Sequence, residues 1–75
     1  MNTNKLYNDI ITRELDINDL VLQDHVGVRD FRPSISFEIN SNNEIIALGS
    51  VMKNEEEFCA FIEEFLNDGY LIAVL

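Results

Sequence analysis

The sequence is poor in the residues that build catalytic and metal sites. Its 75 residues include one cysteine, one histidine, one proline and no tryptophan. A single cysteine, Cys59, excludes an internal disulfide and a cysteine-rich zinc site. Lone cysteines are typical of proteins in a reducing compartment. We therefore expect an intracellular protein without disulfide cross-links.

The few reactive side chains do not form a recognisable catalytic or ligand-binding pattern. Nucleophilic catalysis needs a nucleophile, a base and an orienting group within reach. His25 follows Asp24 directly, and neighbouring residues of a strand point to opposite faces of a sheet. Cys59 would meet His25 only through the tertiary fold, and the alternative is a surface histidine and a small residue at the edge of the core. We therefore expect no enzyme.

Known ligand-binding motifs are also missing. The three glycines stand alone, so the chain has no glycine-rich phosphate loop. The segment DINDL opens like a calcium loop, but Leu20 stands where an oxygen ligand is needed. We therefore expect neither a cofactor nor a metal site.

Long apolar runs are absent as well. The longest, residues 70–75, is far too short to cross a bilayer, and the opening nine residues lack the apolar core of a signal peptide. These features predict a soluble protein in the cytoplasm.

Basic residues are scarce, and this scarcity is the most informative deficit. Five Lys and Arg face 14 Asp and Glu, for a net charge of −9. Residues 1–33 hold four bases and six acids, whereas residues 34–75 hold one base and eight acids. Such a chain repels nucleic acid and anionic membranes, so a basic protein is its natural partner. Solubility alone is the alternative reason for the acid.

The hydrophobic content of 47% is enough for one core, and 75 residues predict a single domain, 1–75. Residues 3–15 predict a first helix with an apolar stripe that includes Leu6 and Ile10, capped by Thr3 or Asn4. Residues 16–19 follow as a connection. Residues 19–28 predict a strand.

Residues 35–52 predict a β-hairpin. Apolar and polar residues alternate from Ile35 to Ile39, and the Asn-rich segment after them is typical of a turn. A two-residue turn at Asn42 and Asn43 would set Ile39 opposite Ile46, and a turn one residue earlier would set it opposite Glu44. The first register is favoured. It leaves the opposite face of the hairpin half polar and half apolar.

Residues 55–68 predict a second helix, capped by Asn54 with Glu57 in a near capping-box position and closed by Gly69. Residues 70–75 predict a final strand, buried on both faces and parallel to residues 44–52 if the two share a sheet. The expected fold is a small single-domain α+β sandwich in the order helix, strand, β-hairpin, helix, strand. Its helices pack on a sheet of three to four strands.

The second helix carries its acids as two ridges opposite an apolar stripe. At about 100° per residue, Glu56 and Glu63 lie along one edge and Glu57, Glu64 and Asp68 along the other. No lysine or arginine follows any of them at the spacing of four residues that would form pairs. Helices built for solubility usually mix signs, because like charges at this spacing repel. These five residues are therefore the candidate partner-binding residues.

The short length, the acidity, the single cysteine and the abundance of Asn and Ile resemble the phage-encoded inhibitors of bacterial defence, especially anti-CRISPR proteins. The opening MNTNKLYNDI also bears some similarity to one inhibitor of a Cas nuclease. The resemblance is one of type, without a shared motif. It implies a small α/β fold in the cytoplasm of a bacterial host cell. It also implies a DNA mimic that occludes the nucleic-acid-binding groove of a defence nuclease such as a Cas effector.

Two other classes of protein fit the same residues. An immunity protein or antitoxin that neutralises a basic toxin would need the same acidic surface. A dimerisation module would instead use the mixed face of the hairpin or the edge of the final strand.

Overall fold

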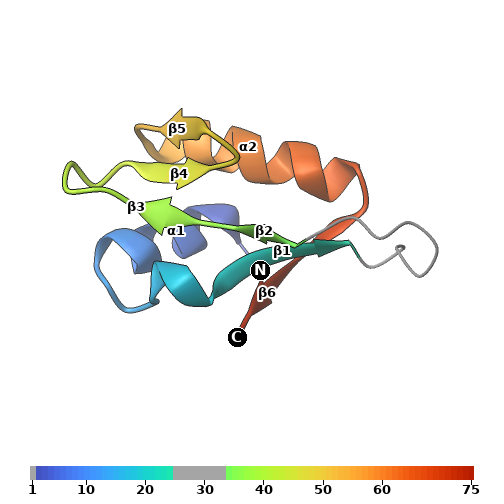
Figure 1. Cartoon of the computed structure of the whole chain (residues 1–75), viewed down its shortest axis with the longest axis horizontal. Coiled ribbons are helices and arrows are strands. Elements are labelled where there is room, and N and C mark those ends of the chain that lie inside the picture. The colour runs from blue at the N-terminus through green and yellow to red at the C-terminus, as the bar shows by residue number, and fades with distance from the viewer. Residues whose placement is uncertain (1, 25–33) are drawn as a thin grey trace.

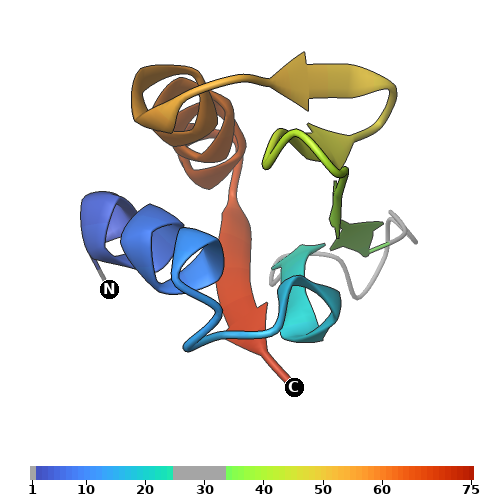
Figure 2. The ribbon, with the colours of Figure 1, turned by 90° about the vertical axis from the view of Figure 1, so that its left-hand side faces the viewer.

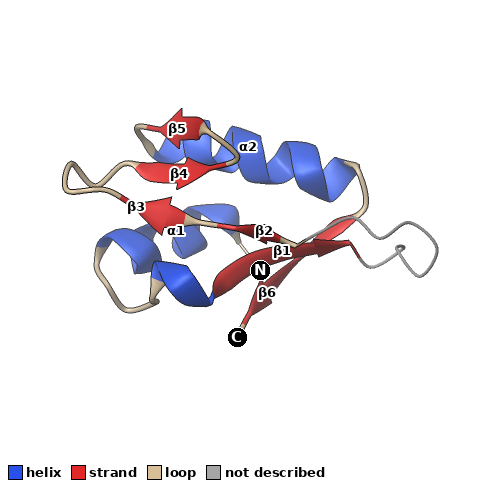
Figure 3. Ribbon diagram, in the orientation of Figure 1, coloured by secondary structure: helices blue, strands red, loops and turns tan. Residues whose placement is uncertain are grey.

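The computed structural model describes residues 2–24 and 34–75, which form two α-helices and two three-stranded antiparallel sheets. The strands follow one another as a single strongly bent layer, and the helices lie together on the other side of the core (Figures 1 and 2). Figure 3 shows how helix and strand are mixed along the chain. The α+β class and the order of helix, strands, helix and strand are confirmed, with two small sheets in place of one.

Helix α1 spans Thr3–Ile11, and its cap is Asn2, one residue before the first predicted cap, Thr3. The side chain of Asn2 accepts hydrogen bonds from the backbone N–H groups of Asn4 and Lys5. The helix stops four residues before the predicted end, because Arg13 takes a left-handed conformation with φ of 65°. The predicted connection after it contains one 3₁₀ turn, η1, Ile17–Asp19, capped by Asp16.

The first sheet has the order β2-β1-β6, with β1 (Leu20–Asp24) in the centre. Strand β2 is Ile35–Ser36 and β6 is Tyr70–Val74, and both run antiparallel to β1. Residues 70–75 and 44–52 lie in different sheets, so the condition for the predicted parallel pairing is not met. Strand β6 is also not buried on both faces, since it is an edge strand with exposed apolar side chains. The rest of the strand predicted for residues 19–28 lies outside the described residues.

The second sheet consists of β3 (Glu38–Ile39), β4 (Ile45–Ala47) and β5 (Ser50–Met52). Buried Phe37 joins β2 to β3, so one bent segment carries the chain from the first sheet into the second. The predicted alternation is confirmed across this bend, with Ile35 and Phe37 buried and the polar Ser36 and Glu38 exposed.

The predicted hairpin register is wrong by one residue. Ile39 pairs with Ile45 rather than Ile46, because the turn contains three residues instead of two. Asn40 holds this turn: its side-chain oxygen accepts hydrogen bonds from the N–H groups of Asn42 at 2.9 Å and Glu44 at 3.0 Å. A shift of one residue exchanges the two faces of a strand. Ile45 therefore enters the core, and Ile46 turns outward.

The mixed face predicted for the hairpin therefore keeps Glu38 and Val51, but Ile46 takes the place of Ile45 and Ala47, which are buried. The outward pairs are Glu38 with Ile46, and Ile46 with Val51. The predicted single strand over residues 44–52 also folds back on itself at Leu48 and Gly49. Both residues have positive φ, 51° and 76°, as a type I′ turn requires.

Helix α2 spans Glu55–Asn67 and packs against α1, β5 and β6. Phe58 and Ile62 are fully buried and anchor it to the core. Aromatic rings continue this packing in a chain from Tyr7 to Tyr70, with ring centroids 4.9–6.3 Å apart. Because its apolar stripe is used in this way, the helix turns its acidic residues toward solvent.

Candidate functional site: the acidic face of helix α2

Local hydrogen bonds fix the start of α2, as the sequence predicted. The side chain of Asn54 accepts a hydrogen bond of 2.9 Å from the N–H of Glu57. The carboxylate of Glu57 in turn accepts one of 2.8 Å from the N–H of Lys53, one residue before the cap. Gly69 closes the other end with φ of 95°. The rotation of α2 is therefore fixed by its caps and its buried stripe, and so is the direction of each carboxylate.

The acidic residues of this segment are all exposed: Glu55, Glu56, Glu57, Glu63, Glu64 and Asp68. We call this set the acidic face. In the part of the chain that the structure describes, Glu56, Glu63 and Glu64 form no ion pair. These three carboxylates are therefore available to a partner.

The acidic face has two sides, each bordered by a shallow hollow. Glu56 and Glu63 line a hollow of about 400 Å³ beside α1, together with Glu55 and Cys59. Glu64 and Asp68 line another of about 330 Å³ with Phe65. Glu57 lines neither and is engaged with the backbone of Lys53. The structure thus gathers four of the five candidate residues into two groups and gives the fifth a capping role.

The pKa of the Cys59 thiol reflects the negative charges along one side of the acidic face. Its pKa is raised first by burial, and then by the negative charges of Glu55 and Glu63. Its Sγ donates a weak hydrogen bond of 3.9 Å to the side-chain oxygen of Asn4, on α1. A protonated thiol of this kind is a poor nucleophile. The thiol is therefore not activated as a nucleophile in this hollow, which three carboxylates line.

Acids at the end of α2 oppose its own dipole. The C-terminus of a helix carries partial negative charge and favours lysine or arginine. The last turn contains Glu64 and no basic residue. The acids of the first turn stabilise the helix, whereas Glu64 does not, so its position needs a reason other than helix stability.

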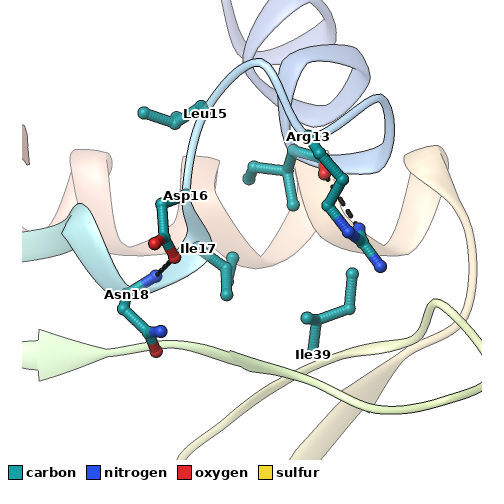
Figure 4. Close-up of a pocket in the computed structure, with 7 residues that line it drawn as sticks. Arg13, Leu15, Asp16, Ile17, Asn18 and Ile39 are labelled. Carbon is teal, nitrogen blue, oxygen red and sulfur yellow. Dashed lines mark hydrogen bonds between the residues drawn. The ribbon is translucent and has the colours of Figure 1, made fainter.

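A further hollow, of about 310 Å³, lies between the end of α1, η1 and β3 (Figure 4). Arg13 stands at its rim and donates hydrogen bonds to the carbonyl of Ile10 at 3.0 Å and to the side chain of Asn43 at 2.9 Å. Asp16 accepts from the N–H of Asn18 at 2.9 Å. Arg13 and Asp16 therefore both have hydrogen-bond partners within the fold. We interpret Arg13 as a link between α1 and the hairpin turn. The sequence analysis missed this link, because it joins residues 30 positions apart.

Other classes of site find no support among residues 2–24 and 34–75. No group of three or more His, Cys, Asp and Glu side chains is placed to hold a metal ion there. Neither helix of this part of the chain has the length and the apolar character that a membrane crossing needs. His25 lies outside the described residues.

Comparisons with known proteins add no candidate. We found no match to the chain among protein-family models, curated proteins or solved structures.

Proposed function

We propose that the chain is a small acidic inhibitor that binds the basic, nucleic-acid-binding groove of a bacterial defence nuclease, such as a Cas effector. The acidic face of α2 is the contact surface in this proposal. The observation that carries it is a row of exposed carboxylates, three of them without an ion pair among the described residues, on a helix whose orientation is fixed.

The spacing of these carboxylates suits a groove that binds DNA. Six acids lie between Glu55 and Asp68, a length of roughly 20 Å at about 1.5 Å per residue. This is about one negative charge per 3–4 Å, close to the roughly 3.4 Å of axis per phosphate in one strand of B-DNA. Lysines and arginines placed to neutralise phosphates would therefore meet carboxylates at a similar density.

The unfavourable electrostatic energy of this arrangement in the free chain also supports a role in binding. Adjacent Glu63 and Glu64 add two negative charges near the negative end of the helix dipole. A basic partner neutralises these charges, so the unfavourable energy is removed on binding. Attraction between opposite charges also speeds association. An immunity protein or antitoxin would use the same surface, and the identity of the inhibited enzyme separates these classes.

Inhibition of DNA cleavage tests the proposal directly. The chain is added in increasing amounts to purified Cas nucleases loaded with guide RNA, and to basic toxin nucleases, and cleavage of a labelled target duplex is followed. We expect inhibition of a Cas nuclease that excess target DNA reverses, because mimic and DNA compete for one groove. Inhibition of toxin nucleases alone would favour the antitoxin class, and binding that DNA does not displace would contradict the mimic.

A further inference from the structure

The outer edge of β6 pairs with no other strand of the described residues. In the sheets formed by the described residues, β6 pairs only with β1. Figure 2 shows β1 on one flank of β6, whereas a helix, α1, lies toward the other. Proteins usually protect such edges with lysine, proline or a bulge in the strand itself, or with a covering helix or loop. The segment Tyr70–Leu75 has no charged residue and no proline.

The backbone groups on this edge can be assigned from the ladder. The N–H of Leu75 donates to the carbonyl of Asp19, on the side of β1. Hydrogen-bonded and non-hydrogen-bonded pairs alternate along an antiparallel ladder. Ala73, two residues earlier, therefore also bonds toward β1, while the N–H and C=O groups of Ile72 and Val74 point away from it. Within residues 2–24 and 34–75 these groups have no hydrogen-bond partner.

We propose that β6 pairs antiparallel with β6 of a second copy of this chain, with Ala73 on the two-fold axis. In this register Ile72 of each chain exchanges both backbone hydrogen bonds with Val74 of the other. One six-stranded sheet results from the two sheets of three strands. The small side chain of Ala73 suits the axis, because non-hydrogen-bonded pairs bring Cα atoms to about 4.5 Å.

The exposed apolar side chains complement one another in the same register. Leu71, 50% exposed, stands opposite Leu75 of the second copy, which is 74% exposed. Directly opposite side chains on a sheet make contact. One leucine pair therefore lies on each side of Ala73 on the outer face of the sheet, and both pairs become buried when the dimer forms. Two symmetric patches that match in this way are what a two-fold dimer requires.

The other face of the strand has room for the partner. Val74, 45% exposed, lines a hollow of about 430 Å³ between β6 and α1. The rest of its lining is partly apolar and partly polar, with Leu6, Leu15, Asn2, Lys5, Asp9 and Glu14. A strand added to the edge would place its own Ile72 and Val74 on this side. A standard interface buries about 800 Å² per partner, whereas the whole chain exposes 4962 Å². The strand alone covers less than that, so we expect a dimer that dissociates in roughly the micromolar range.

The response to salt separates this inference from the proposed function. Two chains of net charge −9 repel, and an uncharged strand lets them approach closely. Salt screens repulsion and attraction alike. Added salt should therefore strengthen the dimer, whereas it should weaken the contact between the acidic face and a basic groove.

Sedimentation equilibrium with a matched pair of variants tests the surface. Val74→Lys places a charge on the β6 edge, and Val51→Lys places the same charge at an equally exposed valine, 45%, on the edge strand β5. We expect Val74→Lys to raise the dimer dissociation constant by roughly tenfold or more, and Val51→Lys to leave it near the wild-type value. A wild-type chain that stays monomeric at millimolar concentration overturns the proposal, as does an equal response of the two variants.

Cross-linking tests the register. In a Cys59→Ser background, Ala73→Cys brings two thiols together on the axis, within the Cα separation that a disulfide needs. Leu71→Cys, on the same face, places its two thiols roughly 14 Å apart at about 3.4 Å per residue. We expect mild oxidation to link the Ala73→Cys chains and not the Leu71→Cys chains. Equal cross-linking of the two variants, or none with Ala73→Cys, overturns this register.

Discussion

Leu48 has a backbone conformation that suits its side chain poorly. Its φ of 51° lies in the left-handed region, which costs a non-glycine residue roughly 1–2 kcal/mol. The side chain is 68% exposed, so burial does not offset that cost. Asn or Gly is the usual residue at the first position of such a turn, and Gly49 already occupies the second.

Replacing Leu48 by Asn should stabilise the fold. Asn tolerates the left-handed conformation, so Leu48→Asn should raise the free energy of unfolding by about 0.5–1.5 kcal/mol, measured by urea denaturation. Leu71→Asn is the control, because Leu71 is similarly exposed but lies in an extended strand, where Asn is disfavoured. A Leu48→Asn variant less stable than the wild type would show that Leu48 contributes more through contacts than it costs in backbone strain.

The pKa of the Cys59 thiol depends on the negative charge on one side of α2. Burial, Glu55 and Glu63 raise its pKa, so less of it is thiolate at any pH near neutrality. We expect iodoacetamide to modify Cys59 more slowly than a free cysteine, with the midpoint of the rate against pH shifted upward. Glu55→Gln combined with Glu63→Gln should move that midpoint down, because two negative charges are removed.

Glu64→Gln is the matched control, since Glu64 is not among the charges that act on this thiol. An equal shift with Glu64→Gln would mean that the whole field of the protein, rather than these two neighbours, sets the pKa of Cys59.

At the scale of elements, α2 was predictable because its signals are local. Asn54, Glu57 and Gly69 mark its ends in the sequence, and the structure places all three in capping roles. The outward direction of Glu63 and Glu64 follows from the period of the helix. Their surroundings were not predictable, because Asn4 reaches Cys59 across 55 residues. The capping bond of Glu57 was predicted only as a near capping box.

The strands were predicted less well, because their pairing depends on distant residues. The alternation from Ile35 to Ile39 identified a strand, yet the register depended on the hydrogen bonds of Asn40, which set the length of the turn. The break at Leu48 gave only the weak signal of the following Gly49, since leucine is not a turn residue. Strand β6 pairs with β1 rather than with the hairpin. No local pattern in the sequence indicates this pairing.

Charge reversal at the two ends of α2 should have opposite effects on stability. Glu64→Lys places a cation in the last turn and should raise the free energy of unfolding by about 0.3–1 kcal/mol. Glu57→Lys opposes the dipole in the first turn and removes the bond to the N–H of Lys53, so it should lower that free energy by about 1 kcal/mol. Thermal and urea unfolding measure both. The two variants have the same net charge, so equal effects would mean that total charge, not the dipole, decides.

At the scale of the whole molecule, the chain separates its charge from its exposed apolar strand. The acids of α2 lie on one element, and the uncharged edge of β6 lies on another. A basic partner at the first surface and a second copy at the other would not compete for the same residues. The net charge of −9 opposes dimerisation and favours a basic partner. Ionic strength therefore shifts the balance between the two associations.

The most direct test of the acidic face is a pair of double charge reversals in the nuclease inhibition assay, at about 50 and 500 mM salt. Glu63→Lys with Glu64→Lys, and Glu14→Lys with Glu38→Lys, change the net charge equally at exposed positions. If α2 binds the groove, the first pair abolishes inhibition, while the second retains most of it and loses it with salt as the wild type does. Equal loss in both pairs, or inhibition unchanged by the first, would contradict the acidic face as the binding surface.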